Sequence, residues 1–279
     1  MKVFKEKIDF LAWRNSLDEE FSLVPTMGNL HAGHLNLVEQ ALGLSQHCIV
    51  SIFVNPLQFG AGEDFGKYPK TLEDDLKKLE EVEKKSGKRI TVFAPQSSLE
   101  IFPQDSKTLI EVKGLDRTLC GKFRPGHFIG VTTVVFHLFR LTRPVLAIFG
   151  QKDFQQYLIV EKMTQDLDLP VKLVMAPTLR NESGLALSSR NQYLSDSDKT
   201  EALKLSLVIN KTCQSFKALG IQKAQDYIKT VLEQDSRFQY LEILDASSLL
   251  RPTGESKKLV VAGAFILGDT RLIDNCLIS

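Results

Sequence analysis

One stretch decides the fold of this chain, and it reads Phe21-Ser22-Leu23-Val24-Pro25-Thr26-Met27-Gly28-Asn29-Leu30-His31-Ala32-Gly33-His34. Its first four residues form an apolar run typical of a buried strand. Residues 35–41 follow with helical spacing, so a glycine-containing turn joins a strand to a helix. The N–H groups and partial positive charge at a helix start favour a bound phosphate.

The two histidines of this turn favour a nucleotide as the ligand. Gly33 has no Cβ, so a nucleotide can lie close to the backbone there. His31 and His34 are three residues apart and face the same side of the first turn, where two imidazoles can stabilise charge building on a triphosphate. Ordinary surface or cap residues and metal ligands are the alternatives. The arrangement resembles the His-x-Gly-His loop of the nucleotidyltransferase and class I synthetase superfamily.

Short apolar runs alternate with amphipathic segments through the first two thirds of the chain. We expect strands at 22–24, 48–54, 90–93, 145–149 and 171–175, and helices near 33–44, 72–85, 130–141 and 154–167. This alternation predicts an α/β fold with βαβ units and a mostly parallel sheet. Ligands bind at the carboxyl ends of such strands, so the histidine loop, residues 55–58 and residues 150–153 are expected at one edge.

The pattern changes after Pro177. Two charged amphipathic helices are expected at 195–217 and 221–232, followed by strands at 240–244 and 259–267 and a short last strand at 271–274. The sequence therefore predicts two domains, residues 1–177 and a smaller α+β domain at 178–279.

Charge and cysteine usage exclude several functional classes. The chain of 279 residues has 35 basic and 34 acidic residues, and from Arg180 onwards it has 13 basic and 12 acidic residues. This balance argues against nucleic-acid partners, including tRNA, and against an anionic membrane. The four cysteines are far apart, which favours free thiols in a reducing compartment. With no signal-like start and no apolar run long enough to span a bilayer, we expect a cytoplasmic protein.

Two further polar segments suit a nucleotide site. In the segment at 150–156, Lys152 can place a point charge on a phosphate, Asp153 can cap the following helix, and Gln156 can hydrogen-bond a second substrate. The segment at 187–191 has two serines and Arg190, which can hold a triphosphate. A plain polar linker is an equal interpretation of that second segment.

Other motifs favour structural roles. Thr71 with Asp74 is expected to form a capping box, although Asp74 or Asp75 is also a candidate Mg²⁺ ligand. The basic, glycine-rich segment at 120–128 is either a turn or part of the site wall. We interpret His47 and His137, which lie in apolar runs, as core or helix residues.

Taken together, seven blocks of this sequence resemble the pantoate–β-alanine ligase family over nearly the whole chain. They lie at residues 25–34, 52–59, 68–71, 119–128, 150–156, 188–191 and 270–275. The resemblance implies a Rossmann-like N-terminal domain, a C-terminal lid domain and a homodimer. It also implies that ATP, with Mg²⁺, activates pantoate as pantoyl adenylate, and that β-alanine then displaces AMP.

The resemblance also assigns residues. His34 is the expected proton donor, His31 its partner, and Lys152 the group that stabilises the transition state. Gln58 and Gln156 would hold pantoate, and Asn55 is a further candidate for substrate binding. The residues implied for ATP are Met27, Gly28, Asn29, Leu30, His31, Ala32, Gly33, His34, Gly150, Gln151, Lys152, Asp153, Leu179, Leu187, Ser188, Ser189 and Arg190.

The departures from the family pattern are modest. Ala32 stands where Glu is frequent, Gln151 where Glu is frequent, Leu187 where Met is frequent, and His137 where Lys is expected. Two other functions are compatible with the histidine loop. One is a nucleotidyltransferase acting on a phosphorylated small molecule, which would not need Gln58 and Gln156 to converge. The other is a nucleotide sensor, which would bind ATP without releasing pyrophosphate.

Overall fold

A computed structural model describes residues 1–60 and 62–278. The chain divides into two compact units. The first comprises Met1–Lys113, Arg124–Gly150 and Ile159–Pro177. The second comprises Gly114–Phe123, Gln151–Leu158 and the chain from residue 178 onwards. Two short segments that precede Pro177 in sequence therefore pack with the C-terminal part.

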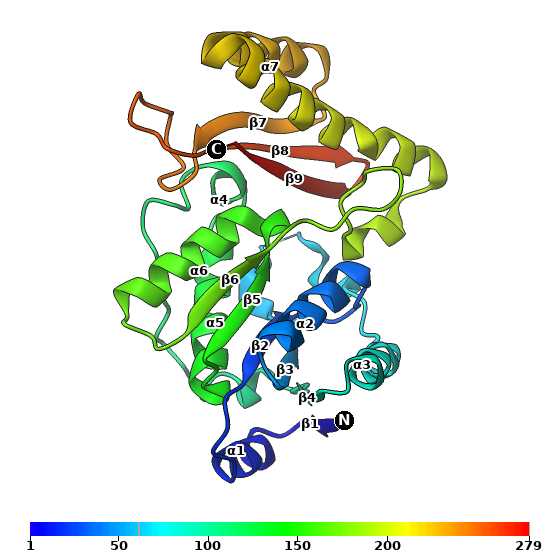
Figure 1. The fold of residues 1–279 in the computed structure, drawn as a ribbon, viewed down its shortest axis with the longest axis vertical. Coiled ribbons are helices and arrows are strands. Elements are labelled where there is room, and N and C mark those ends of the chain that lie inside the picture. Colours follow the sequence, from blue (N-terminus) through cyan, green and yellow to red (C-terminus); the bar gives the residue numbers. More distant parts are fainter. Residues whose placement is uncertain (61, 279) are drawn as a thin grey trace. The chain divides into compact units, whose positions relative to one another are not determined.

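The first unit is built on a six-stranded sheet in which all neighbours are parallel (Figure 1). The strands are β1 (Lys2–Phe4), β2 (Ser22–Thr26), β3 (His47–Ile52), β4 (Arg89–Phe93), β5 (Leu146–Gly150) and β6 (Lys172–Ala176). The predicted α/β fold is confirmed, as are the five strands expected from the sequence. Strand β1 was not predicted, because its three residues are mostly exposed and carry no apolar periodicity.

The helices of the first unit lie where the sequence has 3.6-residue periodicity. They are α1 (Lys7–Asn15), α2 (Ala32–Leu44), α3 (Leu72–Ser86), α5 (His127–Thr142) and the later part of α6 (Phe154–Asp166), with short 3₁₀ turns η1 (Pro56–Gln58), η2 (Asp64–Lys67) and η3 (Ser98–Glu100). Val38 of α2 and Leu79 of α3 pack with Val50 and Val92 of the sheet, and all four are buried. Parallel strands covered on both faces need such continuous apolar runs.

The strand order β1-β4-β3-β2-β5-β6 places a topological switch beside β2. The chain moves outward from β2 to β3 and β4, and then returns to β5 on the other side of β2. The loop after β2 therefore leaves the sheet where strand order reverses, which is where α/β proteins bind ligands. This is the loop that carries His31 and His34.

The second unit is a three-stranded antiparallel sheet with a long helix on it (Figure 1). Its elements are α4 (Leu119–Phe123), η4 (Gln151–Asp153), η5 (Ser189–Tyr193), α7 (Asp196–Gln234), β7 (Phe238–Asp245), β8 (Leu259–Leu267) and β9 (Thr270–Ile278). Leu205 and Ile209 of α7 form a buried cluster with Val261 of β8 and Leu272 of β9. A non-helical Gly220 divides α7, which accounts for the two helices expected from the sequence.

Two local predictions were wrong. The last strand was expected to end at Asp274, but β9 continues to Ile278, because Asp274 and Asn275 are buried through side-chain hydrogen bonds despite their polarity. Thr71 precedes α3 but makes no capping bond; its hydroxyl donates instead to the Asp75 carboxylate at 3.2 Å. The buried Asp75 competes for the hydroxyl that a capping box would have used.

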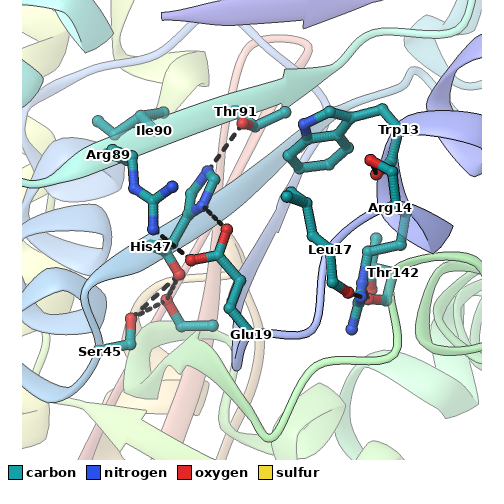
Figure 2. A network of polar contacts seen from close by, with 12 residues as sticks. Trp13, Arg14, Leu17, Glu19, Ser45, His47, Arg89, Ile90, Thr91 and Thr142 are labelled. Carbon is teal, nitrogen blue, oxygen red and sulfur yellow. Dashed lines mark hydrogen bonds and ion pairs between the residues drawn. The ribbon is translucent and has the colours of Figure 1, made fainter.

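A polar network with the buried His47 at its centre lies at the start of β3 (Figure 2). The Nε2 and Nδ1 atoms of His47 contact Thr91 Oγ1 at 2.8 Å and Glu19 Oε1 at 3.2 Å. Glu19 also pairs with Arg89. Burial lowers the pKa of His47, against the opposing effect of its hydrogen bond to Glu19. The interpretation of His47 as a core residue is confirmed.

His137 also behaves as a packing residue. Its ring meets Phe102 edge-on, with the two ring centroids 5.3 Å apart. Burial lowers its pKa, and the charge of Lys7 adds to this. Across both described segments of the chain, we find no helix long and apolar enough to cross a membrane.

Candidate functional site

The turn after β2 is held by a buried carboxylate. Gly28 and Asn29 both have left-handed backbone conformations, with φ of 81° and 51°. This geometry points the N–H groups of Asn29 and Leu30 at Asp75 of α3, whose two oxygens accept them at 2.9 and 2.7 Å. Asp75 is 0% exposed. Successive N–H groups of this kind form an anion-binding nest, and here the anion is supplied by the chain itself.

The same turn requires glycine at position 28. A Cβ there would meet Asp75 Oδ2 and Ile52 Cγ2 at 3.1 Å, and the positive φ disfavours other residues. Lys78, one turn after Asp75, donates to the Leu30 carbonyl at 2.7 Å. The Leu30 side chain is buried in the core. Helix α3 thus anchors the turn at both polar groups of the Leu30 backbone, so this residue fixes the loop rather than facing a ligand with its side chain.

The two histidines cap the start of α2. The Nδ1 atom of His31 accepts the Gly33 N–H at 3.1 Å, and the Nδ1 atom of His34 accepts the His31 N–H at 3.5 Å. Their ring centroids lie 4.1 Å apart. A neutral imidazole that accepts at Nδ1 carries its proton on Nε2. The local hydrogen bonds therefore assign the tautomer in which each Nε2 is a hydrogen-bond donor, as a phosphate ligand requires.

The segment after β3 brings Gln58 next to this turn. Gln58 Nε2 lies 3.0 Å from the sulfur of Met27, which joins a residue expected to hold pantoate to one expected to hold ATP. Asn55 is 1% exposed. Its amide donates to Gln58 Oε1 at 3.1 Å and to the Gly130 carbonyl at 3.0 Å, and its oxygen accepts the Leu57 N–H at 3.2 Å. These bonds hold the Asn55 side chain against Gln58, and the role of Asn55 in substrate binding stays a prediction.

The basic segment at 120–128, which runs into the start of α5, contacts the backbone of the turn that carries Gln58. Arg124 forms two hydrogen bonds to Glu63, at 2.7 and 2.6 Å, and His127 Nδ1 donates to the Gln58 carbonyl at 2.8 Å. Burial acts to raise the pKa of Glu63, but the hydrogen bonds and charge of Arg124 outweigh it and lower that pKa. This segment therefore positions Gln58 through its backbone.

The two acidic residues predicted as Mg²⁺ ligands both have partners within the chain. Asp75 is fully buried and its oxygens accept three hydrogen bonds, from Asn29, Leu30 and Thr71. Asp74 pairs with Lys77 on the surface at 3.1 Å. Among residues 1–60 and 62–278, no group of three or more His, Cys, Asp or Glu side chains is arranged to hold a metal.

In the second unit, η4 carries Lys152. Its ammonium lies 3.7 Å from Asp153, and the side chain is largely buried. On the following helix, Gln155 turns inward and donates to the carbonyls of Leu115 and Thr118 at 2.7 and 2.8 Å. Gln156, the residue expected to bind substrate, is only partly buried.

A second loop of this unit brings the remaining predicted ATP residues together. The Leu187 N–H donates to the Leu179 carbonyl at 3.0 Å, and Arg180 and Ala186 pair beside them. Ser188 then caps η5 by accepting the Arg190 N–H at 3.3 Å. The two leucines, eight positions apart in sequence, are thus neighbours in a narrow hairpin that leads directly to the serines and Arg190.

Sequence reasoning missed the residues that support these loops. Asp75 was considered only as a candidate Mg²⁺ ligand and Lys78 resembles an ordinary charged helix residue, so nothing in the sequence indicated their contacts with the histidine turn. Asp274 and Asn275 did carry a signal, because two polar residues lie between Ile273 and Cys276 in the apolar half of the strand. Such residues need buried hydrogen-bond partners, which only the folded chain identifies.

Comparisons with known proteins support the family resemblance seen in the sequence. A family model described as pantoate-β-alanine ligase matches residues 2–277. The pantothenate synthetase of Methylococcus capsulatus is 41% identical, with the match covering 100% of this chain and 98% of the relative. A crystal structure of the Thermus thermophilus enzyme is 40% identical with a TM-score of 0.88, covering 99% of both chains.

A further solved structure comes from Francisella tularensis and has 31% identity and a TM-score of 0.79, covering 99% of this chain and 97% of that one. It is a pantoate-β-alanine ligase complexed with β-γ ATP and β-alanine. The resemblance seen in the sequence is confirmed by these matches over nearly all of the chain. This chain therefore belongs to the pantoate–β-alanine ligase family and is a ligase.

Proposed function

We propose that this chain condenses pantoate with β-alanine to pantothenate in an ATP-dependent reaction that passes through pantoyl adenylate. The observation that carries this proposal is the histidine pair that caps the first turn of α2, at the switch point of a parallel sheet and beside the Met27–Gln58 contact. The family match over residues 2–277 supports the choice of substrates.

In the first step, a carboxylate oxygen of pantoate attacks the α-phosphorus of ATP. The bond from that phosphorus to the α–β bridging oxygen breaks, and pyrophosphate leaves with the electron pair. Charge builds on the phosphate oxygens, where N–H donors and an ammonium group stabilise it. We assign this role to His34 as the proton donor, His31 as its partner and Lys152 as the cation.

In the second step, the amine of β-alanine attacks the acyl carbonyl of the adenylate. AMP leaves with the electron pair of the acyl–oxygen bond, and the attacking nitrogen loses a proton. Activation is needed because a free carboxylate is a poor acyl donor, whereas AMP is a good leaving group. Gln58 and Gln156 hold pantoate, and their amides suit its hydroxyl and carboxylate groups.

The remaining assignments concern ATP and its loops. The turn at 27–34, the segment at 150–153, Leu179 and the segment at 187–190 bind ATP. Mg²⁺ enters as part of the substrate, bound to the phosphates of ATP, because such an ion binds phosphates together with only one or two carboxylates. Residues 178–279 act as a lid domain, and the enzyme is a homodimer in the cytoplasm. The four free cysteines are consistent with that compartment.

Isotope transfer tests the adenylate directly. Pantoate labelled with ¹⁸O in its carboxylate is incubated with ATP, Mg²⁺ and β-alanine, and the AMP is analysed by mass spectrometry. Attack on the α-phosphorus transfers one labelled oxygen to AMP. Unlabelled AMP, or label found in inorganic phosphate, would overturn the adenylate pathway.

Pyrophosphate–ATP exchange is the second test of the proposed reaction. With β-alanine omitted, exchange that depends on pantoate supports the proposed first step. If the protein binds ATP but catalyses no exchange, the ligase proposal fails, and phosphorylated small molecules are then tested as acceptors of the nucleotidyl group.

A further inference from the structure

A pair of polar residues in the last strand is not used by the proposed chemistry. Asp274 and Asn275 lie in the interior of β9 and are only 3% and 4% exposed. A buried carboxylate and a buried amide are costly unless their hydrogen bonds are satisfied. The hydrogen-bond partners of these two residues show which parts of the second unit they hold in place.

The Asn275 amide clamps the η4 turn. Its Nδ2 donates to the Gln151 carbonyl at 2.9 Å and to the Lys152 carbonyl at 3.0 Å, and its Oδ1 accepts from Gln151 Nε2 at 3.2 Å. The two carbonyls belong to the peptide planes on either side of the Lys152 Cα. With both planes held, φ and ψ of Lys152 are held, and so is the direction in which its side chain leaves the backbone.

The Asp274 carboxylate holds the neighbouring residues. It accepts the Asn275 N–H at 2.8 Å, and it receives two hydrogen bonds from Arg180, at 2.6 and 2.9 Å. These bonds raise the pKa of Arg180. Arg180 lies in the hairpin between Leu179 and Leu187, and it also donates to the Gly184 carbonyl at 3.2 Å. One dipeptide of β9 thus contacts both segments of the second unit that are assigned to ATP.

We propose that Asn275 is a positioning residue that acts through Lys152, and that Asp274 orients it while fixing the second ATP-binding hairpin. The proposal rests on the proposed function, because it assumes that Lys152 stabilises the adenylation transition state. Asn275 touches no reacting atom. It keeps the Lys152 ammonium where charge develops, and transition-state stabilisation depends steeply on such placement.

Asn275→Asp is the sharpest perturbation. It keeps the shape of the side chain but replaces the two N–H donors by an oxygen that faces two carbonyl oxygens. We expect the rate of pantoate-dependent pyrophosphate exchange to fall by about 10²-fold, with a much smaller change in KM for ATP. Asn275→Ala, which introduces no repulsive charge, is measured alongside in case the aspartate variant does not fold.

Leu272→Ala is the matched control. Leu272 is a buried residue of the same strand, and its partners belong to the apolar cluster under α7. This variant should melt at a lower temperature, yet retain the wild-type exchange rate per folded molecule. If it loses as much rate as Asn275→Asp, the effect of Asn275 is only structural and the proposal fails.

A double-mutant cycle with Lys152→Ala separates positioning from stability. If Asn275 acts through Lys152, then Asn275→Asp has little further effect once the lysine is gone. Equal losses in the presence and absence of Lys152 would overturn the proposal. A wild-type enzyme that lacks pantoate-dependent exchange refutes the proposed function itself, whereas normal exchange in a folded Asn275→Asp variant refutes only the positioning role.

Discussion

Replacing Gly130 with alanine tests how closely helix α5 holds the turn that carries Gln58. A Cβ on Gly130 would lie 2.2 Å from the Leu57 carbonyl oxygen and 2.6 Å from the Gln58 nitrogen. Since Cβ contacts below 3.0 Å are essentially never seen, η1 must move away by at least about 0.8 Å. The obstacle is backbone, so no side-chain rotation relieves it.

The size of this shift sets the expected effect. A misplacement of about 1 Å in a substrate-positioning group can cost about 10²-fold in rate, so kcat/KM for pantoate should fall by about that factor. The shift also strains the Asn55 hydrogen bond to the Gly130 carbonyl. Overpacking of this kind destabilises folded proteins by about 1–3 kcal/mol, which leaves room for a folded variant.

Pyrophosphate exchange measured at varied pantoate and at varied ATP concentrations separates the effect of the substitution on pantoate from its effect on ATP. The KM for ATP should stay near the wild-type value, because the histidine turn is anchored by α3 rather than by α5. Gly43→Ala is the control, since a Cβ at that helical glycine meets nothing within 4 Å. A folded Gly130→Ala enzyme with unchanged kcat/KM for pantoate, or with a KM for ATP that rises as much as that for pantoate, would refute the reasoning.

Three further predictions concern other buried groups. Asp75→Asn leaves one buried N–H of the histidine turn without an acceptor. Urea unfolding should therefore show a free energy of unfolding lower by about 1–3 kcal/mol, and titration should show weaker ATP binding. Unchanged values of both would contradict the anchoring role. Burial lowers the pKa of His47 below its usual 6.5, so the unfolded chain binds the proton more readily and stability falls as pH drops below 6.5. Thermal melting between about pH 7 and 5 should therefore be less pH-dependent in His47→Gln, and an equal slope in both proteins would count against this. The hydrogen bond with Cys213 lowers the pKa of Cys276 to about 7, whereas burial raises that of Cys48 to about 12. Iodoacetamide at neutral pH should label Cys276 first, as read by peptide mass spectrometry, and earlier labelling of Cys48 would be the contrary result.

Features set by neighbouring residues were predictable from the sequence. The helix start at His31 and the stop at Gly87, which has the left-handed φ of 65°, depend on contacts within one turn. The central strands of the sheet have apolar runs long enough to identify them. The histidine pair was found because both members lie in the same first turn, and their mutual capping is a local hydrogen-bond pattern.

Roles that depend on distant partners were not predictable. Asn55 is a polar residue of the type that often binds ligands. Only the fold shows that its amide donates a hydrogen bond to the carbonyl of Gly130, 75 positions away. Asp75 satisfies the ordinary preference for an acid at a helix start, which hides its contact with a turn 46 positions earlier. In both places the long-range hydrogen-bond partner is a property of the fold that local sequence patterns do not reveal.

By itself, therefore, the sequence determined the α/β class, the order of the elements and the family, because periodicity and motif spacing are properties of the linear chain. The tertiary structure alone decided which distant groups the buried polar residues bond to. Asn275 reaches Gln151 across 124 positions. A buried amide must find its partners somewhere in the fold, and only folding brings strand β9 against the turn that carries Lys152.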